Sequence, residues 1–201
     1  VRTPGLAAFI PVGQGTLKFG LFDPGTLAAN TSGSLANNPA LAGYTGSDVD
    51  VHIPQIQVSY DIKFGPAAVK FIGGYNTYDE VYWSGTGATS EYTESIDSWV
   101  LGGEVQTNFG PFTLMWQLSY AQNPSAYKGR ASAIGLDPTF DTTSNSIQDV
   151  TQWGTFARFL YKMSDMITWE LGGGYADAQR DQQGGEVDDD ALFLYLNAQI
   201  F

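Results

Sequence analysis

The sequence predicts an all-β protein: a transmembrane antiparallel up-and-down β-barrel, with about eight strands in this chain. Three features of the 201 residues predict it. Large apolar residues occupy every second position over long stretches, short turns alternate with long polar loops, and the charges inside the alternating stretches avoid the apolar phase. A period of two is diagnostic of strands, because successive side chains of a strand point to opposite faces.

The alternating stretches define the predicted strands in chain order. In the clearest of them, Trp99, Leu101, Val105 and Phe109 share one phase. The predicted strands are 17–21, 56–64, 69–75, 99–109, 112–120, 153–161, 167–175 and 192–200. Residues 6–10 also alternate and look like the tail of an earlier strand.

The connections predict which end of each strand carries a loop. Short turns are expected at Gly65-Pro66, at Gly110-Pro111 and at 162–166, and long loops near 23–48, 79–96, 123–149 and 177–190. Loops of that length are uncommon in compact soluble domains. Short turns at one end and long extracellular loops at the other are typical of outer-membrane barrels, so residues 1–201 are interpreted as one transmembrane β-barrel segment.

Hairpin geometry also predicts the register of the strands. A two-residue turn at Gly65-Pro66 places Ile62 opposite Val69 and Asp61 opposite Lys70. A two-residue turn at Gly110-Pro111 places Glu104 opposite Gln117. The apolar pairs predicted at this second turn are Thr107–Leu114, Val105–Trp116, Gly103–Leu118 and Leu101–Tyr120. At the third turn, pairing Tyr161 with Ile167 places Phe159 opposite Trp169 and Arg158 opposite Glu170. Cross-strand pairs of opposite charge favour such a register by fractions of a kcal/mol.

The size of the apolar residues predicts which face they occupy. The interior of an eight-stranded barrel barely holds ordinary side chains, so it would be overfilled by these aromatic rings. Turned outward, the rings would contact lipid as girdles, and the ten steps of ~3.4 Å from Trp99 to Phe109 would span roughly 26 Å of bilayer at a tilt of ~40°. The predicted lipid-facing aromatic residues are Phe64, Tyr75, Trp99, Phe109, Phe112, Trp116, Tyr120, Trp153, Tyr161, Trp169 and Tyr175.

The opposite phase carries the polar residues that are predicted to line a pore. An outward Lys or Arg near the bilayer midplane would cost about 2–4 kcal/mol, so their exclusion from the apolar phase is what lipid exposure requires. Glycines at 74, 102, 172 and 174 share the polar phase and either leave room for a loop or solute or bend the strands. The predicted pore-lining residues are Lys18, Asp61, Lys63, Lys70, Glu104, Gln106, Gln117, Arg158, Lys162 and Glu170.

Composition excludes several other functions. The net charge of −12 disfavours nucleic acid as a partner. With no cysteine and a single histidine, His52, the chain offers no catalytic triad and no multi-histidine metal site, so we expect no enzyme activity, no cofactor and no metal. The acids at 186–190 are interpreted as a charged loop, with a calcium site as the alternative, although they lack EF-hand spacing.

The run IPQIQVSYDIKFGPAAVKFIGGYNTYD at 53–79 resembles outer-membrane porins of Gram-negative bacteria, in particular those of sulfate- and metal-reducing deltaproteobacteria. The same pattern of alternating apolar residues recurs in FGPFTLMWQLSYAQN and ITWELGGGYADAQ. The resemblance implies a water-filled barrel in the bacterial outer membrane, often a homotrimer surrounded by outer-membrane lipid. Such a barrel passes ions and small hydrophilic solutes by passive diffusion.

The ends of the sequence predict that it is part of something larger. Such porins commonly end in a lipid-facing Phe, whereas Phe201 shares its phase with Gln199 and Asn197. No signal peptide precedes the first residues, so a processed or truncated chain is expected. We therefore expect a segment of a barrel of about 16 strands. Two other functions stay open: a structural barrel that sheathes or anchors a partner protein, and a soluble ligand-binding β-barrel.

Overall fold

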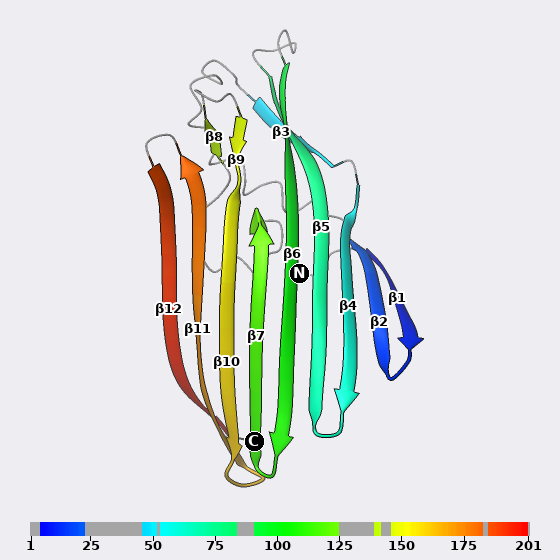
Figure 1. The fold of residues 1–201 in the computed structure, drawn as a ribbon, viewed down its shortest axis with the longest axis vertical. Helices are drawn as coiled ribbons and strands as arrows, with labels where there is room; N and C mark the ends of the chain where they lie inside the picture. Colours follow the sequence, from blue (N-terminus) through cyan, green and yellow to red (C-terminus); the bar gives the residue numbers. More distant parts are fainter. Residues whose placement is uncertain are drawn as a thin grey trace.

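In the computed structural model, residues 5–22, 46–51, 53–83, 91–124, 139–141, 146–182 and 185–200 are described. This part of the chain is built from strands (Figure 1). None of its residues belong to a helix long and apolar enough to cross a membrane. The strands are β1 (Gly5–Val12), β2 (Gly15–Phe22), β3 (Gly46–Asp50), β4 (Gln55–Phe64), β5 (Ala67–Trp83), β6 (Glu91–Phe109), β7 (Phe112–Gln122), β8 (Thr139–Asp141), β9 (Ser146–Gln148), β10 (Val150–Lys162), β11 (Ile167–Gln182) and β12 (Gly185–Ile200).

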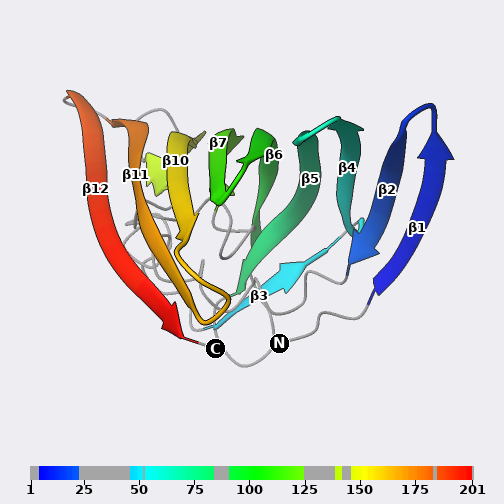
Figure 2. The ribbon, with the colours of Figure 1, turned by 90° about the horizontal axis from the view of Figure 1, so that it is seen from below.

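The main sheet is an antiparallel meander that is curved but not closed. Its order is β1-β2-β4-β5-β6-β7-β10-β11-β12, with β3 pairing on the far part of β5, while β8 and β9 form a separate hairpin. Seen from below, the sheet is a trough with β1 and β12 at its two free edges (Figure 2). The all-β antiparallel prediction is therefore confirmed, and within the described residues the chain forms part of a barrel rather than a closed one.

The strands are more numerous and longer than predicted. The tail expected at 6–10 is the full strand β1, which pairs with β2 from Gly5↔Phe22 to Val12↔Gly15. The loops expected at 79–96 and 177–190 are largely strand, since β5–β6 pair up to Trp83↔Glu91 and β11–β12 up to Gln182↔Gly185. Backbone pairing needs no apolar side chains, so the ladders continue where the apolar alternation stops.

The two glycine-proline hairpins have the predicted register. The pairs Ile62↔Val69 and Asp61↔Lys70 are present in β4–β5, and Val105↔Trp116 and Glu104↔Gln117 are present in β6–β7. Gly65 and Gly110 have φ values of 54° and 62°. A left-handed first position followed by the fixed φ of proline is what a type II′ hairpin turn requires, so these dipeptides set the register.

The predicted register of the third hairpin is wrong by two residues. Tyr161 lies opposite Trp169 instead of Ile167, and Arg158 lies opposite Gly172 instead of Glu170. The connection consists of the four residues 163–166, and the Ser164 hydroxyl in it accepts hydrogen bonds from the backbone N–H groups of Met166 and Ile167, at 3.2 and 3.1 Å. A shift of two residues keeps every side chain on its predicted face, so the assignment of faces survives the error.

Candidate functional site

The two faces of the trough carry opposite chemistry. Side chains of the apolar phase lie on the outer, convex face, where Phe71, Trp116 and Leu171 are 57%, 48% and 55% exposed. The opposite phase faces the concave side, and there Ser98 and Asn76 are fully buried and Glu170 is 6% exposed. A monomeric domain in water rarely exposes such a contiguous apolar face, because exposed apolar patches normally mark contact with protein or membrane.

Polar groups on the convex face find partners within the sheet. The Trp116 indole N–H donates to the Thr155 hydroxyl at 2.8 Å, and that hydroxyl donates to the Gln117 carbonyl at 3.1 Å. The Tyr60 hydroxyl donates to the Val12 carbonyl at 3.0 Å. A polar group in a hydrocarbon environment must form its hydrogen bonds within the protein, because no water is present there to replace a missing partner.

Aromatic residues at the long-loop end point their polar edges away from the apolar band. The Tyr75 hydroxyl donates to the Asp97 carboxylate at 2.8 Å, and the Trp153 indole donates to the Asp177 carboxylate at 3.0 Å. Both carboxylates are on the outward phase, so the exclusion of outward charge holds only between the aromatic bands and not beyond them. Amphipathic rings with an apolar body and a bonded polar tip are typical of the membrane–water interface.

The short-turn end has a second aromatic band. Phe112 stacks on Phe159 and Tyr161 with ring centroids 5.3 and 5.0 Å apart, and Phe109 lies 5.6 Å from Phe112. Side chains from β6, β7 and β10 thus form one continuous ring cluster next to the turns. The eleven aromatic residues predicted on this phase therefore all lie on the convex face, in two bands with Trp116 between them.

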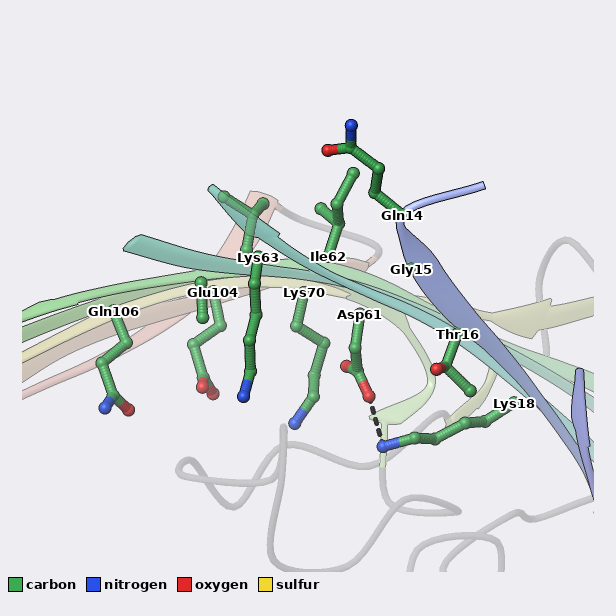
Figure 3. A pocket seen from close by; sticks show the side chains of 12 residues that line it. Gln14, Gly15, Thr16, Lys18, Asp61, Ile62, Lys63, Lys70, Glu104 and Gln106 are labelled. Carbon is green, nitrogen blue, oxygen red and sulfur yellow. Dashed lines mark ion pairs between the residues drawn. The ribbon is translucent and has the colours of Figure 1, made fainter. Parts of the chain in front are cut away.

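Charged side chains gather on the concave face near the short turns. Figure 3 shows Lys18, Asp61, Lys63, Lys70 and Glu104 leaving the sheet on one side, with Ile62 on the other. They line a hollow of about 430 Å³ together with Gln106 and Thr16. Asp61 lies opposite Lys70 in the ladder, but its ion pair is with Lys18 of β2. Neither Lys63 nor Lys70 makes an ion pair with another residue of the described part of the chain.

A second polar group lies on the concave face across β10, β11 and β12. The buried Glu170 carboxylate accepts hydrogen bonds from the Tyr195 hydroxyl at 2.6 Å and the Gln199 amide at 3.2 Å. The Arg158 guanidinium lies 3.7 Å from the same carboxylate. The predicted opposition of Arg158 and Glu170 is thus replaced by a diagonal ion pair, which the two-residue shift still allows.

The remaining predicted polar residues occupy different surroundings. Gln117 is half-buried on the concave face, opposite Glu104 and Phe156. Lys162 instead ends β10, where its ammonium lies 2.7 Å from the Asp165 carboxylate in the turn. The hydrogen bond and the positive charge of Lys162 lower the pKa of Asp165 below its usual value. Lys162 is therefore the last residue of β10, at the rim of the concave face.

The sequence analysis missed two features of this face. Asn123, directly after β7, is fully buried, and it bonds to both neighbouring strands through the backbone of Asp97 and Val150. Phe156 and Phe193 are aromatic residues on the charged phase, and their rings are stacked at 6.0 Å. The available signal was their position: each is an aromatic residue on the phase that faces the trough.

No candidate metal centre is present among the described residues. Their His, Cys, Asp and Glu side chains nowhere form a group of three that could hold a metal ion, and this search includes the acids at 186–190. His52 lies outside the described residues. The concave face offers charge, hydrogen bonds and aromatic surface, which are the properties of a wall that contacts solutes.

Comparison with known proteins gives a fold and no sequence family. No protein-family model matches the chain, and no curated protein matches it. The outer membrane channel DcaP of Acinetobacter baumannii is similar in structure, with a TM-score of 0.55, 13% identity, all of this chain covered and 63% of that chain. The outer-membrane expressed OmpT of Vibrio cholerae has a TM-score of 0.52 and 15% identity, with 96% of this chain and 48% of that chain covered. The chain thus spans about half to two-thirds of the length of these two proteins, and it has the fold of part of an outer-membrane barrel.

Proposed function

We propose that this chain is part of an outer-membrane porin of a Gram-negative bacterium, which forms a water-filled channel for passive diffusion of ions and small hydrophilic solutes. The observation that carries the proposal is the opposition of the two faces. Phe71, Trp116 and Leu171 are exposed on the convex side, while Lys63, Lys70 and Glu104 project from the concave side (Figure 3). A wall that is apolar outside and charged inside suits lipid around it and water within it.

In this proposal the concave residues line the channel. Lys18, Asp61, Lys63, Lys70, Glu104 and Gln106 surround the short-turn end, and Gln117, Arg158 and Glu170 continue the wall, with Lys162 at the rim. Lysines at this end and acids beyond the opposite aromatic band would give an acidic mouth above a more basic throat. Charged rings bias the entry of ions, so the channel would be selective by charge and size.

The resemblance to porins also suggests an oligomeric state for the proposed channel. A homotrimer in the bacterial outer membrane, without enzyme activity or a cofactor, is what that resemblance implies. The alternatives differ in measurable ways. A structural barrel around a partner protein would have a filled lumen and no conductance, and a soluble ligand-binding barrel would dissolve without detergent. The exposed convex face argues against the soluble alternative, because that barrel would turn its apolar phase inward.

Single-channel recording of the purified protein in a planar bilayer tests this function. We expect stepwise conductance in KCl, and we expect Lys63→Glu with Lys70→Glu to raise the K⁺/Cl⁻ permeability ratio roughly threefold or more, because two unpaired cations of the wall become anions. The matched control is Lys162→Glu, which makes the same type of change at the turn and should shift the ratio much less. Absence of conductance from folded protein would contradict the porin proposal.

A further inference from the structure

Three aromatic rings lie nearly parallel to one another on the concave face. The ring centroid of Phe156 on β10 is 6.0 Å from that of Phe193 and 6.4 Å from that of Tyr195, both on β12, at interplanar angles of 19° and 10°. We call these three residues the aromatic platform. They belong to the concave phase, which carries the charged residues and buried apolar residues such as Ile96 and Met115, so lipid contact does not account for them. Phe193 remains 47% exposed in spite of its place on the inner face.

Two glycines of β11 leave room for the two rings of β12. A Cβ atom at Gly172 would lie 2.5 Å from the Cε1, Cζ and hydroxyl oxygen of Tyr195. A Cβ atom at Gly174 would lie 2.8 Å from Cε1 of Phe193. No real side chain tolerates such approaches, so each ring lies over the bare backbone of its cross-strand partner. The glycines predicted to leave room or bend the strand thus leave room for the rings of Tyr195 and Phe193.

Hydrogen-bonding groups border one side of the platform. Tyr195 ends in a hydroxyl that donates to Glu170, and Gln199 donates to the same carboxylate. Arg158 approaches Glu170 only at 3.7 Å, and its Nε is buried with no hydrogen-bond partner among the described residues. The guanidinium side chain is 37% exposed, so it has donors left for a bound molecule.

We propose that the aromatic platform is a solute subsite in the channel wall that takes the flat face of a pyranose sugar; this inference rests on the proposed porin function. The axial C–H groups of a pyranose carry partial positive charge and match the negative face of an aromatic ring. The hydroxyls at the ring edge would then bond to Arg158 and its neighbours. The subsite would hold a sugar long enough to favour its passage over that of an acyclic polyol of similar mass.

Charge favours a neutral ring over an ion at this place. Arg158 and Glu170 carry opposite charges 3.7 Å apart and neutralise each other, so the platform itself has no net charge to attract an ion. An anion would have to compete with the Glu170 carboxylate for Arg158, and a cation would meet Arg158 beside the rings. A neutral solute with one flat apolar face and a polar edge neither competes with Glu170 nor is repelled by Arg158.

Ion-current blockade by sugars in a planar bilayer tests the subsite on the purified protein. We expect glucose to reduce the open-channel KCl current in a saturable manner, whereas sorbitol, its acyclic counterpart of similar mass, at equal concentration produces only the proportional decrease due to viscosity. In Phe193→Ala and in Phe156→Ala the sugar concentration for half-blockade should rise roughly tenfold, in line with the loss of one aromatic contact. The control is Phe71→Ala, which removes the same ring from the convex face and should leave blockade unchanged.

The outcomes separate this inference from the function on which it rests. Loss of all KCl conductance in the unmodified protein would overturn the porin proposal and the subsite together. Normal conductance with sugar blockade that is absent, or that is equal in Phe193→Ala and the unmodified protein, would overturn the subsite alone. Stronger blockade by benzoate than by glucose would also overturn it, because it would assign the platform to aromatic anions. Both platform variants must still conduct KCl, which shows that they have folded.

Discussion

Replacing Leu171 with arginine is expected to lower the free energy of unfolding of the protein in a lipid bilayer by about 2–4 kcal/mol. Leu171 lies on β11 between the two aromatic bands, opposite Phe159, and is 55% exposed on the convex face. If hydrocarbon surrounds that face, the guanidinium must be dehydrated or must distort the bilayer to reach water. Urea unfolding in phospholipid vesicles, followed by tryptophan fluorescence, measures the change.

The control for this prediction places the same residue on the other face. Gln106 lies on β6 near the short turns and lines the concave hollow. Gln106→Arg should change the unfolding free energy by well under 1 kcal/mol, since a guanidinium there would be hydrated. Equal destabilisation by the two arginines would contradict the assignment of lipid to one face and water to the other.

Replacing Asn123 with alanine is expected to destabilise the barrel by about 2–3 kcal/mol, because three hydrogen bonds of a buried side chain are lost at about 1 kcal/mol each. Its amide donates to the Asp97 carbonyl at 2.7 Å and to the Asp149 carboxylate at 2.8 Å, and its oxygen accepts from the Val150 N–H at 2.9 Å. Its φ of 48° is also a conformation that asparagine tolerates better than alanine. Together these contacts tie β6 and β10 across the shorter strand β7.

Asn108→Ala is the matched control for the asparagine prediction. Asn108 is exposed at the short-turn end and accepts one hydrogen bond, from the Thr113 hydroxyl at 2.7 Å. We expect its replacement to cost well under 1 kcal/mol in the same urea unfolding measurement. If the two alanine variants unfold at the same urea concentration, Asn123 does not join the strands as described.

The assignment of residues to faces could be predicted from the sequence because it depends only on a period of two. Trp116 and Leu171 lie on β7 and β11, on either side of β10, and the alternation placed both on the same face. Two hairpin registers were also predictable, since Gly65 and Gly110 with the following prolines admit one tight turn geometry. These features are local, and the chain carries them in a few adjacent residues.

Features that depend on other strands could not be predicted. The register after Lys162 depends on the Ser164 hydroxyl, which accepts hydrogen bonds from the backbone of Met166 and Ile167 inside the turn. The ladders beyond Tyr75 and Trp99 continue through polar residues that look like loop in the sequence. Asn123 is one polar residue among many in a polar stretch, and only the strands around it reveal its bonds.

The candidate wall was predicted in part for the same reason. Lys63, Lys70 and Glu104 could be recognised, because charges on one phase of a strand need only the periodicity. The aromatic platform could not, since it requires knowing that Gly172 lies opposite Tyr195 and Gly174 opposite Phe193 across β11 and β12. A glycine and an aromatic residue some twenty positions apart carry no joint signal in the sequence.

The central claim is that the convex face contacts lipid and the concave face contacts water, and cysteine accessibility tests it most directly. The chain has no cysteine, so each introduced thiol is read without background. Single cysteines at Val69, Lys70, Phe71, Glu104 and Val105 would be treated, in proteoliposomes, with a charged water-soluble methanethiosulfonate reagent. The account predicts fast labelling at Lys70 and Glu104 and little at the other three positions. Fast labelling at Val69, Phe71 and Val105 with protection at Lys70 and Glu104 would contradict it.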